Sequence, residues 1–204
     1  VLQLPRGCSF NTCTFCTFYR DFPFEVKDPQ ALVRHMESVE AYLGRGMELR
    51  RSIFLGDANA LVVPMSRLQP LVEEVARRYA DHPASEGGMH AFLDGFSGAK
   101  KDAEDYRVLK DLGLVRVSVG MESGHDPLLE WLRKPGSAED VAHSVRTMKE
   151  AGLVVVLAMR HVMVSRRLRK LDVPGWYVRG VFVSSLVYYG GIIVFLATTL
   201  IPRG

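Results

Sequence analysis

Short apolar runs alternate with amphipathic segments along the first 159 residues. After an apolar start at residues 1–4, runs that suit buried strands begin near positions 52, 89, 114 and 153. Between them, apolar residues recur three and four positions apart, as at 32, 36, 39 and 43, which is the spacing of one helix face. Repeated strand–helix units with short connections predict a parallel sheet with helices outside it.

Capping residues mark where several of these helices should begin. Asp28 followed by Pro29 predicts a helix start, because aspartate caps free N–H groups and proline suits the first helical position. We expect Ser66 to open the second helix. Ser137, with Asp140 three residues later, predicts a near capping box at the start of another helix.

The order of these elements predicts an α/β fold. We expect residues 1–159 to form a partial (βα)6-type TIM-like barrel, which holds the first five strands and is incomplete at its C-terminus. An open doubly wound sheet fits the same alternation. No G-x-G-x-x-G follows the first strand, however, and this counts against a dinucleotide-binding sheet.

Polar or glycine-rich clusters follow three of the predicted strands. They are Gly-Asp-Ala-Asn at 56–59, Asp-Gly-Phe-Ser at 94–97 and Glu-Ser-Gly at 122–124. The same residue types also favour ordinary turns. Parallel α/β folds carry their sites at the carboxyl ends of the strands. Because the cysteine loop follows the first strand and would share that edge, the three clusters together favour a site.

Composition narrows the class of protein only a little. A length of 204 residues suffices for one domain with a sizeable core. The 26 Lys and Arg residues against 23 Asp and Glu leave a net charge of +3, which gives no clear nucleic-acid signal. The chain begins at Val1 rather than Met, and we expect it to be a segment of a longer protein.

All three cysteines, Cys8, Cys13 and Cys16, lie in one short window. An odd number this close together does not suggest a disulfide framework, and thiolates suit either an iron–sulfur cluster or zinc. A four-iron cluster normally takes four cysteines, so three would leave one iron open for an exogenous ligand. A structural zinc site would want a fourth protein ligand, and the nearest histidine, His35, falls in the middle of a predicted helix. Burial of three small side chains is the alternative without a metal.

The segment from Cys8 to Cys16, with Phe15 just before the last cysteine, resembles the cluster loop of the radical S-adenosylmethionine (SAM) superfamily. The commonest spacing in that family has three residues between the first two cysteines, whereas this chain has four. Residues 53–58 resemble the glycine-rich motif after the second strand, with Gly-Asp-Ala in place of Gly-Gly-Glu. Residues 116–124 resemble the fourth-strand segment, whose polar residues contact SAM.

The run Lys-Pro-Gly-Ser at 134–137 is similar to one broad group within that family, which includes the Elp3, MiaB and coproporphyrinogen-oxidase-like members. The resemblance covers roughly residues 1–159. It implies an enzyme that cleaves SAM reductively to a 5′-deoxyadenosyl radical, which abstracts hydrogen from a substrate that the sequence does not identify. It also implies an electron donor such as flavodoxin or ferredoxin, and a cytoplasmic location.

The resemblance further implies a set of site residues. The cluster ligands would be Cys8, Cys13 and Cys16, and SAM would chelate the open iron. Asn59 and Asp94 could face SAM or the substrate. For Glu122 the alternative is a strand-end carboxylate in a salt bridge. The implied SAM-binding residues are Phe15, Gly56, Asp57, Ala58, Ser97 and Glu122.

The last part of the chain, 160–204, departs from this pattern. Residues 160–170 are strongly basic, and residues 180–202 carry no charge. Such a run could span a bilayer, form buried strands, or mark a truncated or frameshifted end. We favour an atypical C-terminus over a membrane anchor. Two rivals to the enzyme therefore stay open, a non-catalytic iron–sulfur or zinc-binding module and a small membrane-anchored protein.

Overall fold

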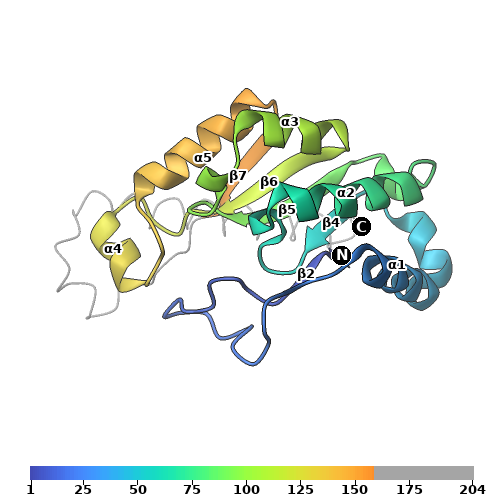
Figure 1. The fold of residues 1–204 in the computed structure, drawn as a ribbon, viewed down its shortest axis with the longest axis horizontal. Helices are drawn as coiled ribbons and strands as arrows, with labels where there is room; N and C mark the ends of the chain where they lie inside the picture. The colour runs from blue at the N-terminus through green and yellow to red at the C-terminus, as the bar shows by residue number, and fades with distance from the viewer. Residues whose placement is uncertain (159–204) are drawn as a thin grey trace, which may run out of the picture. The chain divides into compact units, whose positions relative to one another are not determined.

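The computed structural model describes residues 1–158, which form an α/β unit. Its main sheet has five parallel strands in the order β1-β4-β5-β6-β7, so consecutive strands of this sheet are neighbours (Figure 1). These strands are β1 (Leu2–Gln3), β4 (Ile53–Gly56), β5 (Met89–Asp94), β6 (Leu114–Gly120) and β7 (Val154–Ala158). The predicted α/β class with a parallel sheet is confirmed, and a sixth strand would fall outside the described residues.

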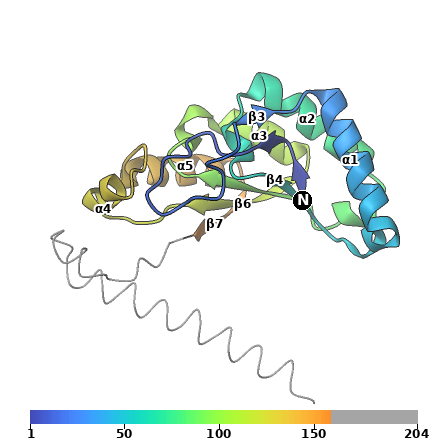
Figure 2. The same cartoon turned by 90° about the horizontal axis from the view of Figure 1, so that it is seen from below.

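Helices follow the strands as the apolar spacing predicted. The α-helices are α1 (Pro29–Leu43), α2 (Met65–Arg78), α3 (Ala103–Asp111), α4 (Asp126–Trp131) and α5 (Ala138–Glu150). Within residues 1–158, four short 3-10 helices complete the loops, at Gly44–Leu49, Ala60–Val62, Pro83–Ser85 and Gly98–Lys100. Helices α1, α2 and α3 lie on one side of the main sheet (Figure 2).

The core lies between the helices and one face of the sheet. Leu55, Ala91 and Val117 are paired across three neighbouring strands and are fully buried. Successive side chains of a strand point to opposite faces. Phe92 and Val156 accordingly lie on the other face, where they keep 37% and 43% of their surface exposed. This second face corresponds to the inside of the predicted barrel.

The caps explain where the helices begin. The Asp28 side chain accepts a hydrogen bond from the Ala31 N–H, and Ser137 forms a full capping box with Asp140. Both starts agree with the sequence. The expectation for Ser66 is wrong, because α2 begins one residue earlier. The carbonyl of Pro64 accepts the first N–H groups of that helix, and Ser66 lies within its first turn.

A small second sheet holds the ends of the cysteine loop together. Strand β2 (Pro5–Arg6) pairs antiparallel with β3 (Glu25–Val26). The intervening residues 7–24 therefore leave and rejoin the fold beside the carboxyl end of β1. This pairing gives the loop a fixed base next to the main sheet.

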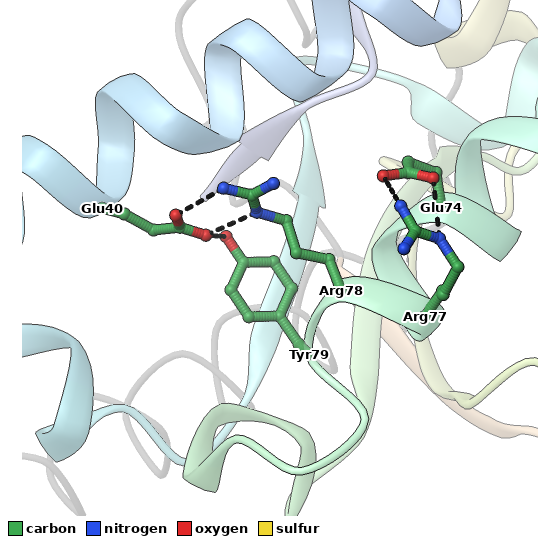
Figure 3. A network of polar contacts seen from close by, with 5 residues as sticks. All are labelled: Glu40, Glu74, Arg77, Arg78 and Tyr79. Atoms are coloured by element: carbon green, nitrogen blue, oxygen red, sulfur yellow. Dashed lines mark hydrogen bonds and ion pairs between the residues drawn. The ribbon is translucent and has the colours of Figure 1, made fainter.

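Figure 3 shows a cluster of charged and aromatic side chains that joins α1 to the C-terminal end of α2. Arg78 donates two hydrogen bonds to the Glu40 carboxylate, at 2.7 and 2.6 Å, and the Tyr79 hydroxyl donates a third at 2.8 Å. The hydrogen bonds from Arg78 have the largest effect on the pKa of Glu40 and lower it, and the hydrogen bond from Tyr79 lowers it further. A second pair, Arg77 with Glu74, stays within α2.

Replacing Glu40 with glutamine is expected to destabilise the chain at pH 7 by about 1 kcal/mol, because a partly buried bidentate ion pair loses its negative charge. The folded state lowers the pKa of Glu40 from 4.5, so its contribution is present above that pH and is lost as the pH falls through the folded pKa. Denaturant unfolding at pH 7 and pH 4 should show a smaller difference between variant and wild type at pH 4. Glu104→Gln, in an exposed pair with Arg107, is the control and should have almost no effect.

No helix among residues 1–158 is long and apolar enough to cross a membrane. The basic stretch 160–170 and the uncharged stretch 180–202 lie outside the described residues. Their proposed roles, and the domain boundary at 159, stay predictions.

Candidate functional site

A pocket of about 360 Å³ lies at the carboxyl end of the sheet. It is lined by the cysteine loop, by the residues that follow β4, by the carboxyl ends of β5 and β6 with the residue Glu122 beyond β6, and by Lys134 after α4. The structure therefore brings together the features that the sequence placed at strand ends. Of the predicted site residues, those lining the pocket are Cys8, Cys13, Phe15, Cys16, Asp57, Ala58, Asn59, Asp94 and Glu122, whereas Gly56 and Ser97 do not line it.

The cysteine loop owes its shape to two residues in the left-handed region. Gly7 has φ +80°, and a Cβ atom there would lie 2.8 Å from the Pro23 carbonyl oxygen, so only glycine fits. Asn11 has φ +50°, which asparagine tolerates better than most residues. Its backbone N–H donates to Cys8 Sγ at 3.4 Å. The segment between Cys8 and Cys13 thus turns back so that Asn11 contacts the Cys8 thiol.

All three thiols are free and face this one pocket. Cys13 is buried, and burial raises the pKa of its thiol, while the nearby Lys134 ammonium acts in the opposite sense. Within residues 1–158 no three His, Cys, Asp or Glu side chains converge as the ligands of a single metal ion would. In a four-iron cluster each thiolate binds a different iron, and three soft donors on one short loop fit that arrangement.

The carboxylate of Asp57, directly after β4, bonds to the cysteine loop. Its Oδ1 accepts from the Tyr19 hydroxyl at 2.8 Å, and its Oδ2 accepts from the Gly7 N–H at 3.3 Å and from Gln3 Nε2 at 3.4 Å. Burial and the Asp57 carboxylate raise the pKa of Tyr19 to about 12. The hydroxyl of Tyr19 therefore stays protonated at neutral pH and acts as a donor.

Asp94 forms a second polar cluster at the end of β5. The buried Asn59 side chain donates to the Asp94 carboxylate, and Ser97 donates to it through both its N–H and its hydroxyl, at 2.6 and 3.0 Å. Burial raises the pKa of Asp94, although these hydrogen bonds oppose the shift. Ser97 thus holds Asp94 in place, and Asp94 is the member of this pair that lines the pocket.

Glu122 and Lys134 form an ion pair in the lining of the pocket, beside the cysteine loop. Lys134 Nζ lies 3.1 Å from Glu122 Oε1, and the two side chains are only 7% and 16% exposed. The same ammonium lies 5.4 Å from the centre of the Phe15 ring, within the range of a cation–π contact. In this structure Glu122 makes the salt bridge near a strand end that was the alternative to SAM contact, with Lys134 as its partner.

Sequence reasoning did not single out Lys134 as a site residue. Helix α4 ends in a Schellman-type turn, in which Arg133 takes φ +55° and the Lys134 N–H donates to the Leu129 carbonyl. The Thr14 N–H of the cysteine loop donates to the Leu132 carbonyl at the same end of α4. In the sequence, the only sign of a role for Lys134 was its place directly before Pro-Gly at 135–136. Its position beside the cysteines depends on the docking of α4 against the cysteine loop.

His35, the nearest histidine in sequence, does not line the pocket. Its Nε2 accepts a hydrogen bond from the Gln3 N–H at 3.0 Å, beside β1. Burial lowers the pKa of this histidine, which agrees with a neutral ring whose Nε2 accepts a hydrogen bond. His35 therefore binds the backbone of β1 and is not a ligand candidate in the cysteine pocket.

A family model, a curated relative and solved structures similar to this chain all point to the same superfamily. The family model described as "Radical SAM superfamily" matches residues 2–165. The anaerobic magnesium-protoporphyrin IX monomethyl ester cyclase of Cereibacter sphaeroides is 26% identical over 156 residues, which are 75% of this chain and 23% of the cyclase. The chain thus spans about a quarter of the length of that relative.

Solved structures show the same fold. The cobalamin-dependent SAM radical enzyme OxsB, with aqua-cobalamin bound, matches 76% of this chain and 23% of its own, with a TM-score of 0.60 and 16% identity. The radical SAM methyltransferase TsrM of Kitasatospora setae, with cobalamin and a [4Fe-4S] cluster bound, matches 76% of this chain and 29% of its own, with a TM-score of 0.55 and 21% identity. The narrower Elp3, MiaB and coproporphyrinogen-oxidase-like group stays a prediction.

Proposed function

This chain belongs to the radical SAM superfamily, whose members use a four-iron cluster and SAM, and we propose that Cys8, Cys13 and Cys16 are its cluster ligands. The observation that carries the proposal is that these three thiols and three strand ends share one pocket. When bound and reduced, the cluster would supply the electron for reductive cleavage of SAM to methionine and a 5′-deoxyadenosyl radical, which would abstract hydrogen from a substrate whose identity stays open.

The pocket residues suit the charged ends of SAM. Lys134 is a buried cation next to the cysteines, and it can hold the methionine carboxylate as a charge-assisted hydrogen-bond donor. Glu122 and Asp94 offer acceptors for the amino or ribose groups, as does the backbone of Ala58. Phe15 presents a ring against which the adenine can pack. The Gly56 carbonyl already accepts the Leu4 N–H at 2.8 Å, so Gly56 contributes by keeping the strand end close to the loop.

The protein must also deliver an electron and protect the cluster. A flavodoxin or a ferredoxin is the electron donor that we propose. A cytoplasmic location fits three free thiols, because that compartment keeps cysteines reduced. The pocket walls formed by β5, β6 and the residues after β4 would limit the access of water to the radical from those sides.

Anaerobic reconstitution with iron and sulfide, followed by dithionite and SAM, tests this function. We expect bound iron and sulfide, a brown chromophore and the release of 5′-deoxyadenosine. A chain that binds the cluster but releases no 5′-deoxyadenosine would be a non-catalytic iron–sulfur module. Stoichiometric zinc in the anaerobically purified chain, with no capacity to take up iron and sulfide, would overturn the cluster assignment itself.

A further inference from the structure

Two features of the chain depart from the family pattern: the four-residue first gap of the cysteine loop and the aspartate at position 57, directly after β4. The structure joins these two departures by hydrogen bonds. Asn11, in the long gap, donates from Nδ2 to the Tyr19 carbonyl at 2.6 Å, and the Tyr19 hydroxyl donates to Asp57. We propose that Asn11, Tyr19 and Asp57 form a positioning network that closes the longer loop and aims its three thiols into one pocket. This proposal rests on the proposed function.

The carboxylate of Asp57 anchors the loop on both sides of the cysteines. Gly7, which precedes Cys8, donates its N–H to one oxygen, and Tyr19, which follows Cys16, donates its hydroxyl to the other. The Asp57 backbone N–H donates to the Pro5 carbonyl as well, at 3.2 Å. A single residue at the end of β4 thus ties the entry and the exit of the loop to the rigid sheet.

Asn11 gives the longer gap its compact turn. Its left-handed backbone reverses the chain between the first two cysteines, and its N–H bonds to Cys8 Sγ. Its side-chain amide bridges to Tyr19, on the other side of the loop. Tyr19 therefore links the two segments, because its backbone carbonyl accepts from Asn11 in the gap and its hydroxyl donates to Asp57 at the strand end.

The same contacts argue against a direct role of Asp57 in holding the methionine amino group. Its Oδ1 accepts from Tyr19, and its Oδ2 accepts from Gly7 and Gln3. An ammonium group would compete with donors that already hold the loop. Asp57 is therefore a positioning residue, which acts on the cluster through the loop.

Hydrogen exchange of the metal-free chain tests the network without any need for turnover. Asp57→Asn and Tyr19→Phe should each make the amides of residues 7–24 exchange about tenfold faster, because a hydrogen bond to a charged group is lost. Exchange in β5, β6 and the helices should not change. The double variant should exchange little faster than Asp57→Asn alone, since Tyr19→Phe removes one of the hydrogen bonds that Asp57→Asn already weakens.

The matched controls are Asp21→Asn, an exposed aspartate of the same loop, and Tyr42→Phe, a tyrosine that is 89% exposed. Both should leave loop exchange unchanged. Unchanged exchange in Tyr19→Phe, which removes only a hydroxyl, would overturn the network. Fully additive effects of Tyr19→Phe and Asp57→Asn would also overturn it, because they would act independently.

The reconstituted chain separates the two possible roles of Asp57. As a loop anchor, Asp57→Asn should lower the cluster content and alter the electron paramagnetic resonance spectrum of the reduced cluster, and Tyr19→Phe should do the same. A ligand of the amino group would instead leave cluster content and loop exchange intact and weaken only SAM binding, and this result would refute the anchor role. If the wild type takes up no cluster, the proposed function fails, while the exchange experiment still decides whether the network exists.

Discussion

Replacing Cys13 with alanine should abolish cluster binding and reduce the formation of 5′-deoxyadenosine by more than about a hundredfold. Loss of an outer partner of a metal ligand already costs about 10- to 100-fold in affinity or activity, so loss of a ligand should cost more. Cys13 is the buried member of the three and lies between the other two in the loop. Its replacement leaves two half-exposed thiols, which cannot hold three irons of a four-iron cluster.

Iron and sulfide content after reconstitution, together with the absorbance of the cluster, measures this effect. Because Cys13 is buried, its removal could also loosen the loop, and Cys13→Ser separates the two causes. Serine keeps the size of the side chain but provides a hard oxygen in place of a soft sulfur, so it should also fail to hold the cluster. Normal cluster content in either variant would show that Cys13 is not a ligand. The metal-free variants should retain the circular dichroism and unfolding midpoint of the metal-free wild type to within a small shift.

Local patterns in the sequence predicted most of the fold because they report on neighbouring residues. The predicted starts at 52, 89, 114 and 153 agree with the observed strands, which begin at Ile53, Met89, Leu114 and Val154. The three strand-end clusters and the cysteines also meet at one pocket, as parallel strands require. Ser66 was misread because α2 begins after Pro64 with no side-chain cap, so no capping residue marks its start in the sequence.

The detailed contacts of the site could not be predicted, since they depend on how distant segments dock. Asp57 and Ser97 both follow strands, as a SAM-binding residue would. The structure shows that the first bonds to the cysteine loop and the second bonds to Asp94. Lys134 reaches the pocket only because α4 ends against the loop. Motif spacing records that a residue lies near a site, but the partner of its side chain is set by packing.

Replacing Lys134 with methionine should weaken the binding of SAM to the reconstituted chain by about 10- to 100-fold. A hydrogen bond between charged groups contributes about 1.5–3 kcal/mol, and each 1.4 kcal/mol corresponds to a factor of ten. The same replacement should destabilise the metal-free chain by about 1–3 kcal/mol, because it leaves the largely buried Glu122 carboxylate without its partner. Equilibrium binding of SAM and denaturant unfolding measure the two effects separately.

A second replacement, Glu122→Gln, distinguishes a role in binding from a role in folding. In the double variant no charge is left unpaired, so much of the lost stability should return. Affinity for SAM should not return, because the cation that holds the carboxylate is still absent. If the double variant regains both stability and affinity, Lys134 serves only to neutralise Glu122. If Lys134→Met alone binds SAM as tightly as the wild type does, the carboxylate of SAM must be held elsewhere in the pocket.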